Sequence, residues 1–504
     1  MQRRSFIAAL ATGSVALAGC STSTGGDPPT DSVTPYDDPL AGTPAETTPG
    51  HPVDETPTPT EEPSAFDELT SVIELETVPR TYAFGSTRLR TDDGAVVRLR
   101  FDRIATAEHP ARLTGTLRNG NDYANTFEIE WIPAVGRVHS RQPDGYDHEA
   151  RLHLAPTEHN DLAETVPEVA RTDDGLWYAT DIGAWITEQH RLEPGETVDL
   201  EYVLVGESGM PGRPTGTYEF RGREETVSVT VWETNSPGPE APSRFAGRSL
   251  PAFDGETITW YHEATRETQA FVRPSTERLE LDGRAEFEMI NNSHEPLSCG
   301  HWNLYKFVDG QWFHVGPGGH FSDCRVLRSG GRKTWSLRAF NGEPVPCDEN
   351  HLGITRGYLG GGEYAVVAGY GHATDSTGAL IELVGDQVTV TPTDDSSIER
   401  DGETVTVTTD SYGDGEHPPD ATVTLTRTGE GDERLLAEQV MGAGWLTSDN
   451  ALRNALAVIE PGVEEVVVRT DEHAADDATG FDSTTRRFRF RDQAYEVTKD
   501  LNAD

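Results

Sequence analysis

Apolar and polar residues alternate with a period of two along much of the chain, the pattern of β-strands that bury one face. Val, Leu and Phe alternate with Arg in residues 97–101, and the same alternation returns at 127–131, 198–204 and 227–231. No clear helical pattern interrupts these runs between 67 and 234. We therefore predict that this part of the chain is built from half-buried strands.

The alternation resumes after a proline-rich stretch. Residues 235–242 read Asn-Ser-Pro-Gly-Pro-Glu-Ala-Pro, a composition typical of a joint between domains. Further strands are predicted at 279–289, 302–312, 335–337 and 364–367. Asp309-Gly310 lies between two apolar runs, which predicts a hairpin.

The C-terminal part of the chain contains both helix-type and strand-type spacings of apolar residues. Residues 435–440 suit a short helix, and a second helix is expected to start at Ser448 or Asp449 and to stop at Pro461-Gly462. Strand patterns surround these helices at 405–407, 423–425, 466–468, 488–490 and 495–497. The sequence predicts a small α+β domain here.

Two groups of residues resemble immunoglobulin-like domains. The turn Glu193-Pro-Gly-Glu196, the strand after it and Gly216-Thr-Tyr-Glu-Phe220 look like the end of such domains in secreted proteins. Asn291-Asn-Ser293, Tyr305–Trp312 and Gly361–Val367 are similar to bacterial immunoglobulin-like lipoprotein domains, which are generally non-catalytic. Three cysteines in this second region depart from that family.

We therefore expect a mainly β fold, with tandem immunoglobulin-like β-sandwiches followed by a small α+β domain. A second, weaker joint lies at 391–399, and no internal repeat of fixed period is found. The expected parts are a lipoprotein signal peptide (1–20), a disordered stalk (21–66), two sandwiches (67–234 and 250–394) and the α+β domain (395–504).

The first twenty residues resemble an export signal with a lipid attachment site. Arg3 and Arg4 precede Ser-Phe-Ile and an apolar run from Ala8 to Ala18. This run has 11 residues, whereas a membrane-spanning helix needs roughly 20. Arg-Arg-Ser-Phe-Ile resembles the twin-arginine export motif, and Leu-Ala-Gly before Cys20 resembles the lipobox of bacterial and archaeal lipoproteins. The resemblance implies cleavage before Cys20, a diacylglyceryl-type lipid on its thiol and a place on the extracytoplasmic face of the cell membrane.

Acidic residues dominate the composition. The 86 Asp and Glu against 41 Lys and Arg give a formal charge of -45, which makes nucleic acid an unexpected partner. Only Lys306, Lys333 and Lys499 are lysines, and the whole resembles proteins of salt-loving archaea. High salt screens the self-repulsion of such a chain. In the stalk, Thr, Pro, Asp and Glu prevail and apolar residues are too few for a core.

Sequence signatures of catalysis are missing. There is no Gly-rich phosphate loop, no His-Glu-x-x-His helix and no Gly-x-Ser-x-Gly elbow, so we assign neither an enzymatic activity nor a cofactor. The loop 410–417 and the acidic run 471–477 do not match the spacing of a calcium-binding EF-hand. We interpret both as solvated acidic surface.

Cysteines and histidines gather in the second predicted sandwich. They are Cys299, Cys324, Cys347, His294, His301, His314, His320 and His351. Thiolates and imidazoles are ligands of copper and zinc. A disulfide is the alternative, because an exported domain can keep one. If the domain follows an immunoglobulin-like strand order, Cys299 and Cys324 lie at the same end and pair, which leaves Cys347 free.

Two further surface features are candidates for recognition. Trp177, Tyr178, Trp185, Trp260 and Tyr261 suit either strand packing or a patch that stacks on sugars or proteins. The sequon Asn291-Asn-Ser is a possible site of N-glycosylation.

Together these observations predict a lipid-anchored cell-surface binding or scaffolding protein that binds envelope proteins or glycans. The alternative is an extracytoplasmic protein that handles copper or zinc through the Cys- and His-rich region.

Overall fold

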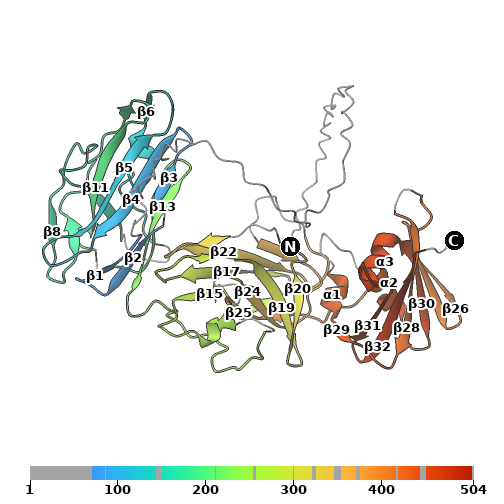
Figure 1. The fold of residues 1–504 in the computed structure, drawn as a ribbon. Helices are drawn as coiled ribbons and strands as arrows, with labels where there is room; N and C mark the ends of the chain where they lie inside the picture. The colour runs from blue at the N-terminus through green and yellow to red at the C-terminus, as the bar shows by residue number, and fades with distance from the viewer. Residues whose placement is uncertain are drawn as a thin grey trace, which may run out of the picture. The chain divides into compact units, whose positions relative to one another are not determined.

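The computed structural model describes residues 71–501 apart from 86, 144–149, 211, 254–256, 299, 321–324, 346–352, 371–374, 416–417 and 443–449 (Figure 1). Strands far outnumber helices, so the mainly β prediction is confirmed. The strands form several separate sheets, as expected for a chain with more than one β-sandwich. The predicted signal peptide and stalk lie outside the described residues.

Two sheets enclose the first core, and we call them the first sheet pair. One has the order β1-β2-β13-β12, with β1 (Val72–Leu75), β2 (Arg80–Phe84), β13 (Thr226–Glu233) and β12 (Gly216–Arg221). The other has the order β3-β4-β5-β11-β9-β8, with β3 (Arg88–Arg90), β4 (Ala95–Arg103), β5 (Ala111–Asn119), β11 (Thr197–Glu207), β9 (Trp177–Ala179) and β8 (Val169–Arg171), and β7 (Leu152–Pro156) also pairs with β11. A small ribbon joins β6 (Asn125–Phe127) and β10 (His190–Leu192).

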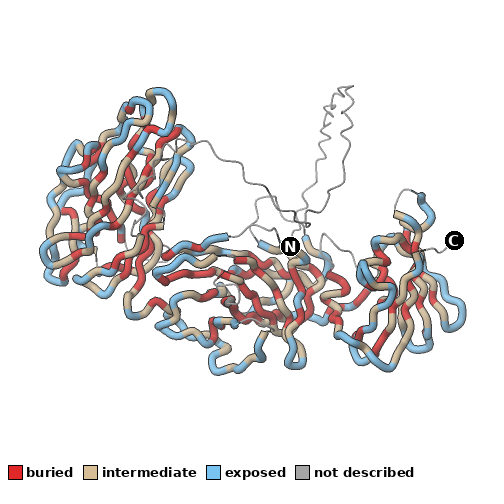
Figure 2. The backbone as a smooth tube through the Cα atoms, viewed as in Figure 1, coloured by how far each residue is buried: buried red, intermediate tan, exposed pale blue. Residues whose placement is uncertain are grey.

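The alternation of apolar and polar residues correctly predicts which side chains form the core of the first sheet pair. Val97, Leu99 and Phe101 are buried and belong to one core cluster with Tyr82 and Val229 of the other sheet. Figure 2 colours the buried stretches of the backbone red. The predicted strand 127–131 is wrong beyond its first residue. The chain leaves β6 at Phe127 and forms the 3-10 turn η1 (Ile129–Trp131). The alternation at this place reflects a turn that buries Ile129.

A second sheet pair encloses its own core. One sheet has the order β14-β25-β24-β19-β20, with β14 (Thr257–Trp260), β25 (Asp375–Val384), β24 (Gly362–Ala368), β19 (Trp302–Val308) and β20 (Gln311–Gly316), and β16 (Arg278–Glu280) pairs with β25. The other has the order β15-β17-β22-β23, with β15 (Ala270–Pro274), β17 (Gly283–Asn291), β22 (Arg332–Ala339) and β23 (Gly353–Arg356). Smaller elements complete it: the 3-10 turn η2 (Tyr261–Glu263) and the ribbon of β18 (Leu297–Ser298) with β21 (Val326–Leu327). The hairpin expected at Asp309-Gly310 joins β19 to β20.

The C-terminal sheet contains both parallel and antiparallel pairs. Its order is β26-β27-β30-β28-β32-β31-β29, with β26 (Ser396–Asp401), β27 (Thr404–Thr409), β30 (Glu465–Asp471), β28 (Asp420–Thr428), β32 (Gln493–Asp500), β31 (Thr485–Phe490) and β29 (Glu433–Leu435). The helices α2 (Asn450–Val458) and α3 (Glu472–Thr479) pack on this sheet, and α1 (Ala437–Met441) precedes them. Val388 and Val390, placed by the sequence before the joint, belong to this third core.

The acidic run 471–477 is a helix and not an open loop. Asp471 caps α3 by accepting a hydrogen bond from the backbone N–H of Ala474 at 3.0 Å. Ala474, Ala475 and Ala478 are buried against the sheet. Asp476 pairs with Lys499 of β32 at 2.5 Å and its side chain is only 15% exposed, so the interpretation of the whole run as solvated surface is wrong for this residue.

A buried asparagine occurs at the same place in both sheet pairs. Asn119 ends β5 and Asn291 ends β17, and both strands are the middle one of three antiparallel strands. Each amide nitrogen donates to the carbonyl four residues later and to two successive carbonyls just before the next strand of the sheet. These acceptors are Tyr123, Leu192 and Glu193 for Asn119, and Glu295, Leu327 and Arg328 for Asn291.

A tyrosine repeats in the same way. Tyr218 donates its hydroxyl hydrogen to the carbonyl of Pro214, and Tyr364 donates to that of Gly360, both at 2.7 Å. Each tyrosine is the third residue of a Gly-x-Tyr segment that opens β12 or β24. The two sheet pairs therefore share an internal repeat, although its spacing along the chain is uneven.

Candidate functional site

A cavity of about 550 Å³ opens at one end of the second sheet pair. Its inner wall includes Trp302, the first residue of β19, and Trp335 of β22, which belong to opposite sheets. Their rings are nearly parallel, with centroids 5.6 Å apart and planes at 5°. The indole stack closes the core, and the cavity lies outside it; Met441 and Gly442 at the end of α1 line another part of the wall.

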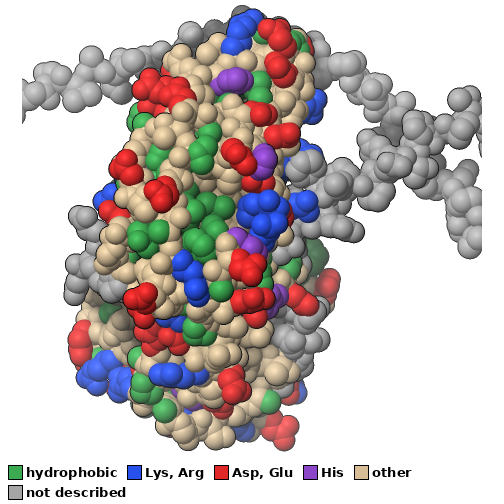
Figure 3. Space-filling model, turned by 90° about the vertical axis from the view of Figure 1, so that its left-hand side faces the viewer, with side chains coloured by type: hydrophobic (Ala, Val, Ile, Leu, Met, Phe, Trp, Pro, Cys, Tyr) green, Lys and Arg blue, Asp and Glu red, His purple; other side chains and the backbone are tan. Residues whose placement is uncertain are grey.

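The lining of this cavity carries positive charge. It includes Arg325, Lys333 and Arg356 together with the imidazoles of His301 and His320. Among the described residues that line it there is no aspartate or glutamate. This is notable in a chain with 86 acidic residues, whose side chains are scattered over the face shown in Figure 3.

Arg356 is the least compensated of these cations. Its Nε is buried and has no hydrogen-bond partner. Burial lowers the pKa of Arg356, because the charged form loses hydration in this wall. Trp302 Nε1 is a second buried donor in the wall without a partner. Both N–H groups can therefore donate a hydrogen bond to a ligand, since no acceptor for them is found among the described residues.

Two of the predicted histidines meet at Asn303, and a third, His301, lies beside the ring of one of them. Asn303 Oδ1 lies 2.8 Å from His320 Nε2 and 3.3 Å from His314 Nε2, while the rings of His301 and His320 have centroids 4.7 Å apart. Burial, and then His320 and Arg356, lower the pKa of His314. Burial, His301 and Arg325 lower the pKa of His320. The lowered pKa values favour the neutral forms of His314 and His320 near neutral pH, in which each ring can donate or accept a hydrogen bond.

The remaining members of the predicted Cys and His cluster are elsewhere or not described. His294 lies 3.3 Å from Glu74 and does not join the other three histidines. Cys299, Cys324, Cys347 and His351 lie outside the described residues, so their pairing and metal binding stay predictions. Within the described ranges, no group of three or more His, Cys, Asp or Glu is arranged to hold a metal ion.

Asn291 is a structural residue, and its predicted glycosylation is a poor fit to the fold. The residue is 0% exposed, its amide nitrogen serves three carbonyls, and its Oδ1 accepts from the backbone N–H and hydroxyl of Ser293. A glycan on this nitrogen has no room in the folded protein. The sequon at 291–293 is explained by the repeated asparagine motif.

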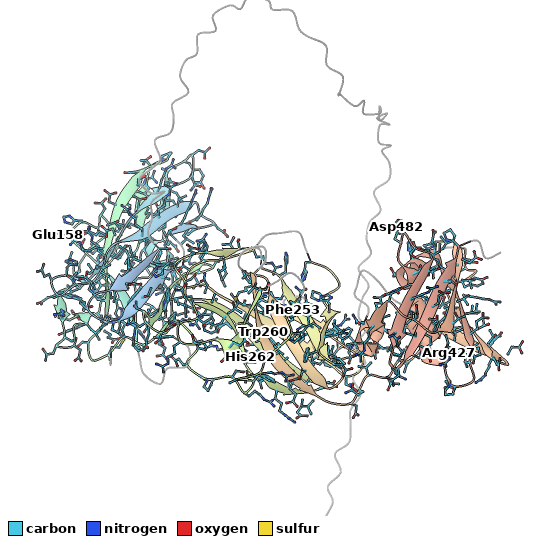
Figure 4. All side chains as sticks on the ribbon, turned by 60° about the horizontal axis from the view of Figure 1, so that its bottom comes forward. Glu158, Phe253, Trp260, His262, Arg427 and Asp482 are labelled. Carbon is cyan, nitrogen blue, oxygen red and sulfur yellow. The ribbon has the colours of Figure 1, made fainter. Side chains whose placement is uncertain are left out.

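The aromatic residues considered as a recognition patch mainly serve packing. Trp185, Trp260 and Tyr261 are buried, and Trp177 donates to the carbonyl of Thr106 at 2.9 Å. Tyr178 is half-buried in β9. Trp260 stacks on Trp312 and lies close to Phe253, a residue of the segment after the proline-rich joint (Figure 4). That segment covers the outer face of the sheet there.

Sequence reasoning missed the cations of the cavity. Lys333 lies on β22 and Arg356 on β23, and these strands are parallel partners joined by a long connection. No local spacing pattern marks such a pair. The only available signal was Lys333 itself, one of three lysines in the chain.

Comparisons with known proteins leave the function open. No family model and no curated protein matches the chain. Among solved structures, a polysaccharide lyase is 12% identical, with 60% of this chain and 35% of that chain covered and a TM-score of 0.14. Escherichia coli alpha-2-macroglobulin activated by porcine elastase is 11% identical, with coverages of 69% and 30% and a TM-score of 0.14. A GH2 beta-galacturonidase from Eisenbergiella tayi is 11% identical, with coverages of 65% and 45% and a TM-score of 0.11.

The chain thus spans less than half the length of these solved structures, and TM-scores this low support no argument about fold or function. No helix within the described ranges is long and apolar enough to cross a membrane.

Proposed function

We propose that this chain is a lipid-anchored binding protein of the outer cell surface whose second sheet pair binds a small anionic ligand. In this proposal Cys20 carries the lipid, residues 21–66 form the stalk, and the two sheet pairs are immunoglobulin-like sandwiches followed by an α+β domain. The protein performs no catalysis. The cavity at Trp302 and Trp335 is its binding site.

The charge of the cavity carries the proposal. Three cations line it with no described carboxylate among them, and the guanidinium of Arg356 is partly desolvated without compensation. A buried charge that lacks a partner is costly, so an anion entering the cavity gains the interaction that the free protein lacks. A guanidinium matches the two oxygens of a carboxylate or phosphate.

The binding test uses the full chain at high salt, with thermal unfolding followed at constant ionic strength. Glucuronate, citrate and phosphate are the probes, and glucose is the neutral control. We expect at least one of the anions to raise the melting temperature, and glucose to have no effect. Failure of all three anions to stabilise the protein contradicts the proposal.

Variants assign the effect to the cavity. Arg356→Met is expected to abolish the stabilisation by the anion. Arg266→Met removes one positive charge from an exposed position of the same sheet pair and serves as the control. Equal stabilisation of the Arg356→Met and Arg266→Met proteins places the anion elsewhere and rejects this site.

The anchor is tested separately. Replacing Arg3 and Arg4 by lysines is expected to retain the chain inside the cell with its signal uncleaved. Cys20→Ser is expected to release an exported chain from the membrane fraction. A Cys20→Ser chain that remains membrane-bound to the same extent contradicts the lipid anchor.

Metal handling is the second candidate, favoured by the convergence of His301, His314 and His320 close to two cysteines in sequence. A free-thiol count and metal analysis on one aerobically purified sample distinguish the two. One free thiol and no metal indicate a disulfide and reject metal handling. Stoichiometric copper or zinc that is lost in Cys299→Ser or Cys324→Ser supports it.

A further inference from the structure

Arg213, in the segment that leads into β12, is a buried arginine with incomplete hydrogen bonding. The residue is only 6% exposed. Its Nη2 donates to the carbonyl of Trp177 at 3.0 Å, whereas its Nε and Nη1 are buried and have no hydrogen-bond partner among the described residues. Arginine is rarely buried to this extent unless it is paired. Two nitrogen atoms of a buried cation are therefore left unsatisfied.

The position of this guanidinium is set by the surrounding strands. Arg80 of β2 donates from its Nε to the backbone carbonyl of Arg213 at 2.9 Å, and the carbonyl of Trp177 in β9 holds Nη2. Gly206 of β11 leaves the room that the guanidinium needs, because a Cβ at this position would lie 2.2 Å from Nη1. The guanidinium thus packs directly on the backbone of β11.

Carboxylates on the adjoining strands do not neutralise Arg213. Glu233 in β13 forms its ion pair with Arg80, at 3.4 Å. Glu207 follows Gly206 in β11, and successive side chains of a strand point to opposite faces, so Glu207 points away from the face that Arg213 covers. A buried charge without a counter-charge is costly, which makes a bound anion favourable here.

A cavity of about 10 Å³ lies beside the guanidinium. Most of its wall is apolar, and the polar side chains in the wall are those of Arg213, Tyr82 and Thr77. No aspartate or glutamate is among the described residues that line it. The volume suits one particle about the size of a water molecule. Among anions, only a monoatomic ion such as chloride fits after a slight shift of the flexible Arg213 side chain, since sulfate, phosphate and carboxylates are too large.

Tyr82 makes this cavity more favourable for an anion. The residue is 1% exposed, and burial raises its pKa to about 12, while the charges of Arg213 and Arg80 act in the opposite direction. The hydroxyl therefore keeps its hydrogen at neutral pH and lies in the field of two guanidinium groups. A positive field and N–H and O–H donors in an apolar wall suit an anion and disfavour a cation.

We propose that Arg213 holds a chloride ion in this cavity through its Nε and Nη1. A water molecule would accept a hydrogen bond there but would leave the charge of Arg213 unbalanced, whereas chloride accepts from both nitrogens and compensates the charge. The stability of the first sheet pair then depends on chloride itself and not only on ionic strength. This inference is independent of the cavity at Trp302 and Trp335.

Thermal unfolding of the full chain tests for the ion. Total sodium is held at about 2 M, where long-range electrostatic effects are screened, and chloride replaces gluconate, an anion too large for the cavity. Above the dissociation constant, we expect the melting temperature to rise by about 3 °C for each tenfold increase in chloride. A melting temperature that does not change with chloride contradicts the proposal.

Substitution of Arg213 assigns the effect to this site. In gluconate, Arg213→Met removes an uncompensated buried charge and is expected to melt no lower than the parent. In chloride the parent is stabilised and the variant is not. Arg191→Met removes the same charge from an exposed position in β10 and is expected to keep the chloride dependence. Equal chloride dependence in Arg213→Met and Arg191→Met places the ion elsewhere and rejects the site.

Diffraction locates the ion without any substitution. Crystals of the parent grown with bromide in place of chloride are expected to show an anomalous peak beside Nε and Nη1 of Arg213. Gly206→Ala keeps the charge but displaces the guanidinium, so the peak is expected to disappear. A water molecule or an empty cavity at this place in the parent, with bromide found only elsewhere, overturns the assignment.

Discussion

Lys306 on β19 forms a buried ion pair with Glu438 in α1. The side chains are only 6% and 5% exposed. Glu438 Oε1 also accepts a hydrogen bond from the backbone N–H of Gly360 at 3.2 Å, and the hydroxyl of Tyr364 lies 3.5 Å away. Burial, followed by the charge of Glu438, raises the pKa of Tyr364 well above its usual value. One carboxylate thus joins the second sheet pair to the helix α1, which follows β29 of the C-terminal sheet.

Loss of one partner of this pair is expected to cost stability. Lys306→Met leaves Glu438 buried without its cation and is predicted to lower the free energy of unfolding by about 3–5 kcal/mol. The double variant Lys306→Met/Glu438→Leu is predicted to recover most of that loss. Denaturant unfolding in high salt measures both. Arg191→Met, which breaks an exposed ion pair with Glu193, serves as the control and is expected to change little.

His139 and His153 form a second unusual pair, in the first sheet pair. Their Nδ1 atoms are 2.8 Å apart, and His139 Nε2 lies 3.2 Å from the carbonyl of Gly183. Since a carbonyl only accepts, His139 carries its hydrogen on Nε2, and His153 must donate from Nδ1 to His139. Burial, His139 and the nearby arginines lower the pKa of His153 to about 3.

This pair predicts a loss of stability in mild acid. Below about pH 6.5 the unfolded His153 gains a proton, whereas the folded one stays neutral down to about pH 3. The unfolded state then binds more protons, so the free energy of unfolding falls by about 2 kcal/mol from pH 7 to pH 5. We expect the free energy of unfolding, measured with urea, to differ less between pH 7 and pH 5 for His153→Phe than for the parent. An unchanged difference contradicts this account, and His159→Gln on the exposed surface is the control.

Replacement of the repeated asparagines tests their shared role. In Asn291→Asp or Asn119→Asp, an acceptor faces three carbonyls, and each variant is predicted to lose about 3 kcal/mol of unfolding free energy. Asn235→Asp introduces the same charge at an exposed position and is expected to be nearly neutral. The intact mass of the exported chain is expected to show no glycan on Asn291, and a glycan there in a folded chain refutes the structural reading of that residue.

The cavity makes a prediction about stability without ligand. Arg356→Met removes an uncompensated cation and is predicted to raise the free energy of unfolding by about 1 kcal/mol. If Arg356→Met gains stability and loses anion binding, the charge of Arg356 serves ligand binding at a cost to the stability of the free protein. A marked loss of stability instead shows that Arg356 serves the fold, and chemical denaturation without added anions decides between the two.

Local pattern was sufficient for elements whose apolar residues face one side. The strands around Val97 and Val466 and the helix at Leu452 were predicted for this reason. The helix α3 was not predicted, because acidic residues dominate its sequence and its only buried apolar residues are three small alanines. At η1, the alternating residues belong to a turn, and only tertiary packing distinguishes it from a strand.

The candidate sites depend on contacts between distant residues. Lys333 and Arg356 come together through a parallel pairing. Arg213 reaches the carbonyl of Trp177 on β9, a contact that composition does not reveal. The repeat was likewise hidden, since the loops between the asparagine and the tyrosine differ in length in the two sheet pairs. The hydrogen bonds reveal this repeat because they depend on where the backbone carbonyls lie in space and not on the number of residues between the partners.

The matching asparagine and tyrosine arrangements separate the strand framework of each sheet pair from the loops around it. In each pair a buried amide and a tyrosine hydroxyl hold backbone carbonyls beside the strands. Loops of different length and sequence can therefore connect the strands while the same carbonyls stay fixed.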